Sequence, residues 1–546
     1  MKKHLYGLLV IAVLAAQTAF AQTQPKPIRI TPAERKAVEG VTAKQLSDYL
    51  HFVASDEMEG RDTPSRGLDT TAKFIGMNLS RWGFKPAGDD GTYYQKIALR
   101  SETADADSNS FKVGDTTYKF NEDYFRLAGN ISVSGPLVFV GDGWMVKSKG
   151  IDAYKGVDVS GKIVVIYSKA PARGINGMAL PAGVTQADLK PEAKGVDWAD
   201  PTTYAKSKGA KGLITIAGPQ LVNFWPRLKG FLGRERVSPE KLETGGQQAD
   251  PNFPVLLLSS PAGEALVGGK EKLDAGTAFE IGKDVAITAG AKVETKWTQN
   301  VVALWEGSDP VLKKEMVAIG AHYDHDGVRP DAPGPDKIWN GADDDGSGTV
   351  AVLSIAEALA HSAIKPKRSI LFVWHCGEEK GLWGSEYFNK FPTVDIKQVV
   401  AQLNIDMIGR SKPAGDTDPK DAELSGPNMI YVIGKDMMSS TLGNIVSGVN
   451  SAYLKMDYDT RYDDPNDKNR FFFRSDHFNY AQNGIPVTFW FDGVHVDYHQ
   501  PSDTADKIDY VKMEKVTRTI MLTLFKLADL KVRPAIDKEL PKELRR

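Results

Sequence analysis

Histidine and carboxylate side chains recur in five short segments of the C-terminal half of this 546-residue chain. The segments are residues 320–324 (GAHYD), 341–348 (GADDDGSG), 377–385 (GEEKGLWGS), 404–409 (NIDMIG) and 498–503 (YHQPSD). Histidines and carboxylates without thiolates suit a borderline-hard cation such as Zn²⁺, and a carboxylate can bridge two ions. The five segments together therefore predict a metal site.

Two neighbouring acids, Glu378 and Glu379, could divide the work of such a site. One can coordinate a metal while the other moves a proton. Taken alone, a Glu-Glu pair is more typical of an exposed turn. The four other segments favour the functional interpretation, because five such signals rarely coincide by chance.

Apolar runs precede most of these segments and predict the elements that position them. Strands are expected at residues 300–305, 316–321, 370–374, 399–405 and 485–491, and helices at 347–361 and 510–530. Strands that alternate with helices predict an α/β fold, with a mixed, mostly parallel sheet covered by helices on both faces. Sheets of this kind carry their chemistry at the carboxyl ends of the strands, where the acidic residues fall.

The sequence pattern changes between residues 113 and 290, where short β-like runs alternate with turns rich in Gly and Asp. No cluster of His or acidic residues follows these runs, so we expect a β-rich α/β binding or covering module. The remaining domain, which carries the five segments, would comprise residues 22–112 and 291–530. Residues 531–546 read as a charged tail that frays.

The N-terminus has the pattern of a secretory signal at residues 1–21. Lys2 and Lys3 precede an apolar run, and Ala19-Phe20-Ala21 supplies small residues for cleavage. The run is shorter than the roughly 20 residues that cross a bilayer, so no stable membrane anchor is expected after cleavage. The pattern predicts a periplasmic or secreted protein.

The charge balance and the cysteine count of the chain limit which partners and which covalent features it can have. Lys and Arg number 68 against 70 Asp and Glu, which gives no electrostatic footprint for nucleic acid. The one cysteine, Cys376, excludes an intramolecular disulfide. Its place beside the Glu pair allows a nucleophile, but a small buried filler is the favoured interpretation.

The five motifs, in this order over about residues 300–530, resemble the co-catalytic zinc aminopeptidases of the M28 peptidase family. Residues 50–61 (LHFVASDEMEGR) resemble the N-terminal part of the same catalytic domain. Residues 152–162 (DAYKGVDVSGK) resemble the protease-associated (PA) domain that some members carry as an insertion. The resemblance implies a zinc-exopeptidase fold with a PA-like domain at residues 113–290.

The resemblance also implies two Zn²⁺ ions and a role for each motif residue. His322 and Asp406 would bind one ion, Glu379 and His499 the other, and Asp344 would bridge them. Asp344 is chosen among three consecutive aspartates because it matches the family's Gly-x-x-Asp spacing. Glu378 would be the general base, and Asp324 would accept the free ring N–H of His322.

Two further side chains are hypotheses with competing interpretations. Tyr498 could donate to the oxyanion of the reacting carbonyl, or simply pack. Arg474 resembles a residue of the family's substrate pocket and could stabilise the oxyanion or orient the peptide. An ion pair between Arg474 and Asp476 is the structural alternative.

The expected function is an aminopeptidase that acts on peptides with a free N-terminus. A carboxypeptidase on the same metal centre remains open. A glutaminyl-cyclase-like enzyme, which uses one zinc, and a non-catalytic binding ectodomain are less favoured because no ligand is missing. The preferred N-terminal residue and the oligomeric state stay open.

Overall fold

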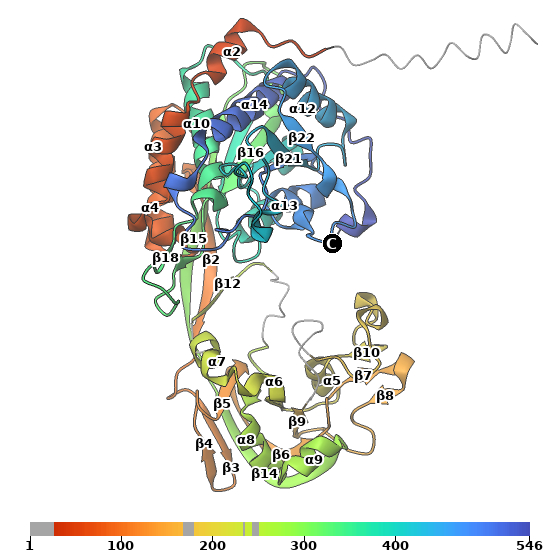
Figure 1. Ribbon diagram of the computed structural model, residues 1–546. Coiled ribbons are helices and arrows are strands. Elements are labelled where there is room, and N and C mark those ends of the chain that lie inside the picture. The colour runs from red at the N-terminus through yellow and green to blue at the C-terminus, as the bar shows by residue number, and fades with distance from the viewer. Residues whose placement is uncertain (1–26, 168–178, 233–234, 243–249, 546) are drawn as a thin grey trace, which may run out of the picture. The chain divides into compact units, whose positions relative to one another are not determined.

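The computed structural model describes residues 27–167, 179–232, 235–242 and 250–545 (Figure 1). The expected signal at residues 1–21 lies outside the described residues. The chain divides into two compact units: unit 1 comprises Met1–Ile97 and Trp297–Arg546, and unit 2 comprises Ala98–Lys296. The strands β2 (Tyr94–Thr103) and β15 (Lys292–Trp305) carry the chain out of unit 1 and back into it.

The sheet of unit 1 confirms the mixed, mostly parallel architecture. From β15 inward, its strands run in the order β19 (Ser369–His375), β16 (Met316–His322), β20 (Val399–Ile405), β23 (Val487–Phe491), β21 (Met429–Ile433) and β22 (Asp457–Asp459). The strands β19, β16, β20 and β23 are parallel, whereas β15 is antiparallel to β19 and β21 to β23. The short β1 (Lys85–Pro86) pairs with β15.

Helices cover both faces of this sheet, as two neighbouring residues of β19 demonstrate. The Trp374 indole donates to the Thr349 carbonyl of α10 (Gly348–His361), with a nitrogen–oxygen distance of 3.1 Å. The next side chain, His375, places Nε2 3.1 Å from the Tyr480 hydroxyl of α13 (His477–Gln482). Successive side chains of a strand point to opposite faces, so α10 and α13 lie on opposite sides.

The remaining helices of unit 1 complete these two layers. α14 (Tyr510–Ala528), α3 (Ala43–Val53) and α2 (Pro32–Val38) contact α10; α12 (Ser440–Ala452) contacts α14; α4 (Arg66–Arg81) contacts α10; and α11 (Trp383–Lys390) contacts α13. The N-cap residue Thr42 accepts the Gln45 N–H at 3.1 Å, but the Gln45 side chain donates to Glu357 instead of returning to the cap. Only half of a capping box therefore forms at α3, and the other half ties α3 to α10.

The charged C-terminal tail does not fray, contrary to the expectation from its composition. Leu540 and Leu544 are buried in the core that also contains Ala481 and Ile485. The Gln482 side chain donates to the Leu544 carbonyl at 2.8 Å. Two leucines among the charges supply enough apolar surface to anchor the segment.

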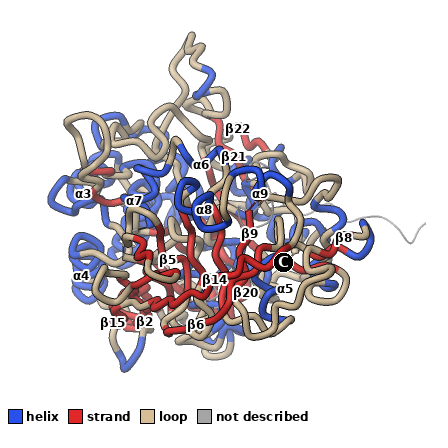
Figure 2. Tube along the Cα trace, turned by 90° about the horizontal axis from the view of Figure 1, so that it is seen from below, coloured by secondary structure: helices blue, strands red, loops and turns tan. Residues whose placement is uncertain are grey.

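Unit 2 is built on a second, β-rich sheet. Its strands run in the order β4 (Thr116–Tyr118), β3 (Ser110–Val113), β14 (Phe279–Ala289), β6 (Ile131–Phe139), β9 (Ile163–Tyr167), β11 (Gly212–Ile216), β13 (Val255–Leu258) and β5 (Tyr124–Ala128). The helices α8 (Ser260–Val267) and α9 (Lys270–Ala275) share its core through Leu266 and Leu273. Figure 2 draws both helices in blue and the strands of the sheet in red. The unit also holds α5 (Pro201–Ser207), α6 (Pro219–Val222), α7 (Trp225–Leu232), β12 (Arg236–Pro239) and a small sheet of β10 (Trp198–Ala199), β7 (Met145–Val146) and β8 (Ile151–Asp152).

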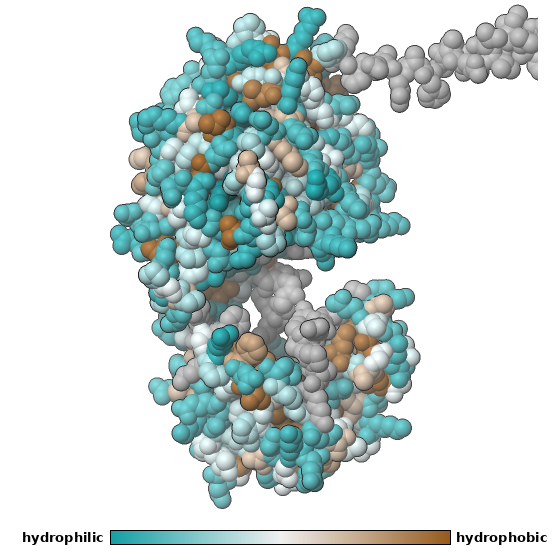
Figure 3. All heavy atoms as spheres, viewed as in Figure 1, coloured by the Kyte–Doolittle hydropathy of each residue, from teal (hydrophilic) through white to brown (hydrophobic). Residues whose placement is uncertain are grey.

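The surface of unit 1 is mainly hydrophilic on the face drawn in Figure 3, with its apolar side chains scattered. Val311 and Val532, among the most exposed apolar side chains, are far apart in sequence, and both lie outside the helices and strands. Within the described residues, no helix is both long and apolar enough to cross a membrane.

Candidate metal centre

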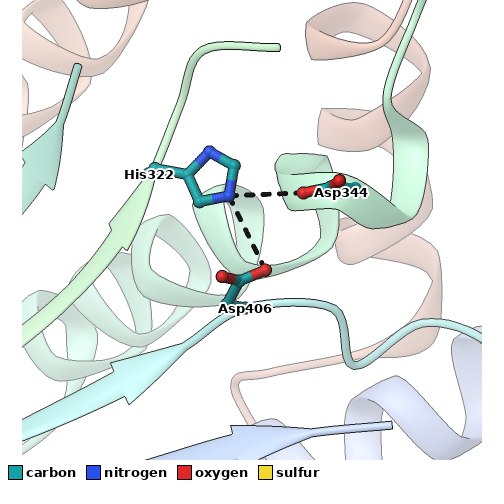
Figure 4. Close-up of side chains that lie close together, drawn as sticks. All are labelled: His322, Asp344 and Asp406. Carbon is teal, nitrogen blue, oxygen red and sulfur yellow. Dashed lines mark ion pairs between the residues drawn. The ribbon is translucent and has the colours of Figure 1, made fainter. Parts of the chain in front are cut away.

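His322 and Asp406 lie at the carboxyl ends of two adjacent strands, next to Asp344. His322 is the last residue of β16, and Asp406 follows the last residue of the neighbouring β20. The His322 Nε2 atom lies 3.3 Å from Asp344 Oδ1 and 3.6 Å from Asp406 Oδ1 (Figure 4). All three side chains are buried. We call this group the inner metal position.

A second group, the outer metal position, contains His499, Glu379 and the same Asp344. The His499 Nε2 atom lies 3.0 Å from Asp344 Oδ2 and 3.3 Å from Glu379 Oε2. The two carboxylate oxygens of Asp344 thus face different groups, Oδ1 the inner and Oδ2 the outer. This is the arrangement of a carboxylate that bridges two cations.

Two residues that sequence reasoning did not assign, His325 and Asp326, also lie at the outer position. The His325 Nδ1 atom is 2.8 Å from Glu379 Oε1, and Asp326 Oδ2 is 3.4 Å from His499 Nδ1. His325 is completely buried, and neither ring nitrogen has a hydrogen-bond partner in the described part of the chain. The available signal was the run His-Tyr-Asp-His-Asp at residues 322–326, which holds a second His and a second Asp directly after the motif.

Glu378 lies beside the inner position with its carboxylate partly open to the cavity. Its Oε2 atom is 3.9 Å from His322 Nε2, and its side chain is 12% exposed. The Glu378 N–H donates to Asp324 Oδ1 at 3.1 Å. Burial raises the pKa of the Glu378 carboxyl well above its ordinary value. The environment therefore favours a carboxylate that holds a proton readily.

Asp324 approaches His322 in a different way from the one expected. The Asp324 backbone carbonyl lies 3.2 Å from His322 Nδ1, whereas its nearer carboxylate oxygen is 3.7 Å away. The carboxylate instead accepts the Glu378 N–H. Asp324 thereby connects the His322 segment to the loop that carries the Glu pair.

The two metal-facing histidines are strongly influenced by the surrounding acids. Burial lowers the pKa of His322, but the charges of Asp406 and Glu378 outweigh it and leave this pKa well above 6.5. Burial also opposes protonation of His499, yet hydrogen bonding to Asp344 raises its pKa to about 9. Without a cation, protons on these histidines would neutralise the carboxylates.

The donor set fits a metal ion. Buried atoms that face the two positions, including His322 Nε2 and Glu379 Oε1, have no hydrogen-bond partner among the described residues. Buried polar atoms are otherwise nearly always paired. Imidazole and carboxylate donors within a few ångströms of one another match the preferences of Zn²⁺.

Tyr498 and Arg474 face the same cavity and contact each other. An Arg474 guanidinium N–H donates to the Tyr498 hydroxyl oxygen at 3.1 Å, and the guanidinium lies over the Phe471 ring, 4.9 Å from its centroid. Both line a small cavity with Asp344, Glu378 and Asp406. The alternative ion pair between Arg474 and Asp476 does not form, because the buried Asp476 carboxylate faces His375 Nδ1 at 3.5 Å.

Cys376 lies at the end of β19 with its side chain buried. Burial raises the pKa of its thiol. A buried thiol with a raised pKa is a poor nucleophile. The geometry agrees with the filler interpretation.

A buried arginine from the N-terminal part of the chain joins two loops of the site. The Arg61 guanidinium donates to the carbonyls of Tyr323 at 2.9 Å, Asn340 at 2.7 Å and Gly341 at 2.9 Å. The Arg61 carbonyl in turn accepts the His325 N–H at 3.2 Å. The neighbouring Thr63 hydroxyl accepts the Gly377 N–H of the third loop at 3.1 Å. The turn around Arg61 therefore supports all three loops that flank the strand ends.

Asp503, the last residue of its motif, fixes the loop that carries the bridging carboxylate. Its Oδ2 atom accepts the N–H groups of Asp343 and Asp344 at 2.9 and 3.2 Å. Its other oxygen lies 3.6 Å from an Arg410 nitrogen. Two successive N–H groups of this loop are thus held by the Asp503 carboxylate, which is itself paired with Arg410.

Comparison with known proteins gives a consistent picture. Residues 300–524 match the model of the peptidase family M28. The chain is 29% identical over 247 residues to a probable leucine aminopeptidase of Arthroderma otae, a match that covers 43% of this chain and 60% of that relative. The chain thus spans less than two thirds of the length of this relative.

Solved structures also resemble this chain. An aminopeptidase from Aneurinibacillus sp. strain AM-1 superposes with a TM-score of 0.50 at 19% identity, over 92% of this chain and 98% of that one. This likeness supports the fold of the chain. A zinc aminopeptidase from Bacillus subtilis gives a TM-score of 0.46 at 17% identity, over 92% and 99%.

Proposed function

We propose that this protein is a zinc-dependent aminopeptidase of peptidase family M28, whose model matches residues 300–524, and that it releases N-terminal residues from peptides. The observation that carries the proposal is the bridging geometry of Asp344 between the inner and outer positions. A hydrolytic metal centre with an adjacent, partly exposed glutamate suits attack of water on a peptide carbonyl.

We propose that two Zn²⁺ ions bind, one held by His322 and Asp406 and the other by Glu379 and His499, with Asp344 shared. The separate orientation of the two Asp344 oxygens supports two ions over one. Bound zinc supplies a Lewis acid for the carbonyl and a nucleophilic water at neutral pH. The matching relatives are named as leucine aminopeptidases, and the substrate class of this chain is proposed by analogy with them.

Glu378 is the general base in this proposal. Its carboxylate takes a proton from the attacking water while the water oxygen bonds to the scissile carbonyl carbon. The same group then gives the proton to the amine nitrogen as the C–N bond breaks. The burial that raises the Glu378 pKa favours this role, because a base must also hold the proton long enough to return it.

Tyr498 is placed to donate its phenolic O–H to the carbonyl oxygen that becomes negatively charged. Arg474 donates to the Tyr498 oxygen at 3.1 Å, which orients the phenol and leaves its own proton free to donate. A hydrogen-bond donor aimed at the developing charge lowers the barrier by stabilising the transition state.

A carboxypeptidase is the second candidate function, and Arg474 is the residue that favours it. A carboxypeptidase needs a cation for the substrate carboxylate, and Arg474 is a cation that lines the cavity. Its contacts with Tyr498 and Phe471 favour the orienting role instead.

We further propose that unit 2 contains a PA domain and that residues 1–21 direct export to the periplasm or medium. The β-rich sheet of unit 2 and its motif at residues 152–162 support the first part. The candidate metal groups in the described residues all belong to unit 1, which fits a non-catalytic role for unit 2.

A paired substrate test decides between the candidates. The purified protein is incubated with leucyl-p-nitroanilide and with N-acetylated peptides, with and without a chelator. The proposal predicts release only from free amino termini, with activity lost on chelation and restored by zinc. Release of C-terminal residues from the acetylated peptides would instead establish a carboxypeptidase.

A further inference from the structure

His499 is the least protected member of the metal centre and receives no support from a strand. Its side chain is 33% exposed, whereas that of His322 is fully buried. Its backbone has φ of 53°, in the left-handed region that residues other than glycine rarely adopt. Neighbouring structure must therefore fix both its backbone and its ring.

A short hairpin makes both of these contacts. β17 (Gly327–Val328) pairs antiparallel with β18 (Ile338–Trp339), and we call residues 326–339 the outer hairpin. At its start, Asp326 Oδ2 lies 3.4 Å from His499 Nδ1. At its end, the Trp339 indole N–H donates to the His499 carbonyl at 3.0 Å. One hairpin thus holds the ring of His499 from one end and its backbone from the other.

Arg329 links these two contacts within the outer hairpin. An Arg329 guanidinium nitrogen is 2.5 Å from Asp326 Oδ2, and the guanidinium carbon lies 4.8 Å from the centroid of the Trp339 ring. The guanidinium of Arg329 pairs with the Asp326 carboxylate and lies over the Trp339 ring. The two side chains that contact His499 are therefore ordered together.

The outer hairpin is also anchored to the body of unit 1. Gly60 lies so close that a Cβ atom there would meet the Trp339 carbonyl oxygen, and a Cβ at Gly327 would meet the Asp62 side chain. Gly327 has φ of 76°, which glycine adopts without strain. The glycines let the two backbones approach directly, so the hairpin rests on the turn that contains Arg61.

We infer that the outer hairpin is a positioning device for the outer metal position, with Asp326 and Trp339 as positioning residues for His499. The inference rests on the proposed function, because it assumes that His499 binds a cation. A carboxylate beside the Nδ1 of a ligating histidine favours the tautomer that leaves Nε2 free to bind the metal, and Asp326 Oδ2 lies 3.4 Å from His499 Nδ1. The inner position has its own support at Asp324, so the two positions should lose their ions independently.

The test measures zinc content and affinity in addition to activity. Wild type, Asp326→Ala, Asp326→Asn and Trp339→Phe are titrated with zinc against a chromophoric chelator, and bound zinc is counted by mass spectrometry after dialysis. Val328→Thr, a change at an exposed hairpin side chain, serves as the matched control. Trp339→Phe keeps the ring beneath Arg329 and removes only the indole donor.

Asp326→Ala should weaken the second zinc by about 10- to 100-fold and leave the tighter one unchanged, as loss of a group behind a ligand typically does. Asp326→Asn, which keeps an acceptor oxygen, should weaken it less, and Trp339→Phe should weaken it only a few-fold. Val328→Thr should bind zinc like wild type. Retention of the first ion and an unchanged melting curve exclude misfolding as the cause.

Two results would overturn the inference. One is two ions bound with wild-type affinity in both Asp326→Ala and Trp339→Phe. The other is an equal weakening of both ions in every variant that still folds. A wild-type protein that binds fewer than two ions would contradict the proposed function itself, before any variant is compared.

Discussion

The inner and outer metal positions share one aspartate but are built by different means. The proposed inner ligands, His322 and Asp406, lie at the ends of two adjacent, buried strands, whose spacing the sheet fixes. The proposed outer ligands, Glu379 and His499, lie on loops, and His499 is partly open to solvent. Strand ends place side chains by regular geometry, whereas loops need supporting contacts from elsewhere in the chain. The inner position therefore follows from the strand pattern of the sequence, whereas the outer position depends on tertiary contacts between loops.

The largest expected effect comes from Glu378, the proposed general base, which lies beside the inner position. Glu378→Gln keeps the size and burial of the side chain but removes the base. We expect kcat to fall by about 10²- to 10⁴-fold because water is no longer deprotonated in the transition state. Steady-state kinetics on leucyl-p-nitroanilide measure this loss, and zinc content should stay at the wild-type level. A variant with both normal zinc content and normal kcat would remove Glu378 from the base role.

The second prediction separates the two positions directly. His322→Asn and His499→Asn each remove one imidazole ligand from one position. We expect each variant to lose one of the two zinc ions, and the His322 variant to lose the more tightly bound one because its position is fully buried. Zinc counting after graded chelation reports both losses. Removal of both ions by either single change would show that the positions cannot be filled separately.

The pH dependence of zinc binding follows from the proton held by His499. Its pKa of about 9 in the metal-free protein lies above the ordinary value, so the ring is protonated at neutral pH and must lose this proton to bind zinc. Affinity of the outer position should therefore rise with pH, by up to about tenfold per unit, and level off near pH 9. Zinc titrations between pH 6 and 9 measure the slope. In His499→Asn the part of the slope that belongs to this proton should disappear.

His325 offers a sharper test of how the outer position is supported. Its Nδ1 atom lies 2.8 Å from Glu379 Oε1 without a hydrogen bond between them, and a small rotation of the ring would let Nδ1–H donate to Glu379. His325→Asn keeps a donor near Nδ1, while His325→Leu keeps the bulk and loses the donor. We expect the Leu variant to weaken the second zinc more than the Asn variant does, measured by chelator competition. Equal zinc affinities in the two variants would show that His325 supports the outer position only by packing.

The smallest functional effect is expected from Arg61, which acts on both positions through the backbone. Arg61→Met fills the space but leaves several buried carbonyls without donors, and each unsatisfied group costs about 1–3 kcal/mol. We expect a clear drop in melting temperature, with zinc stoichiometry unchanged at low temperature. Differential scanning calorimetry measures the first effect. A selective loss of one ion would instead assign Arg61 to that position alone.

The sequence predicted the parts of unit 1 that obey a simple repeat. The strand at residues 399–405 was placed with its observed bounds, because apolar residues recur at every second position from Val399 to Ile405 and polar residues flank the segment. β21, α12 and the outer hairpin were not predicted. The hairpin has two-residue strands and a loop rich in Pro and Gly, which carry no periodic signal.

The candidate site follows the same division. The inner residues were predicted as ligands from the resemblance to the M28 family, in motifs that follow predicted strands. The contributions of His325 and Asp326 were missed because they depend on a contact with a loop more than a hundred residues later in the chain. The Arg474–Asp476 alternative failed for a related reason, since sequence proximity did not reveal that Asp476 turns into the core toward His375.

The contacts of Arg61 have a consequence for how the protein is made. Its acceptors at Tyr323, Asn340 and Gly341 lie 262, 279 and 280 residues downstream, and the whole of unit 2 is translated in between. At roughly 5–20 residues per second, the ribosome needs on the order of 14–56 s to supply them. Unit 2 is continuous in sequence and can fold during this interval. Unit 1 can therefore complete its fold only after unit 2 has been synthesised, when the acceptors of Arg61 become available.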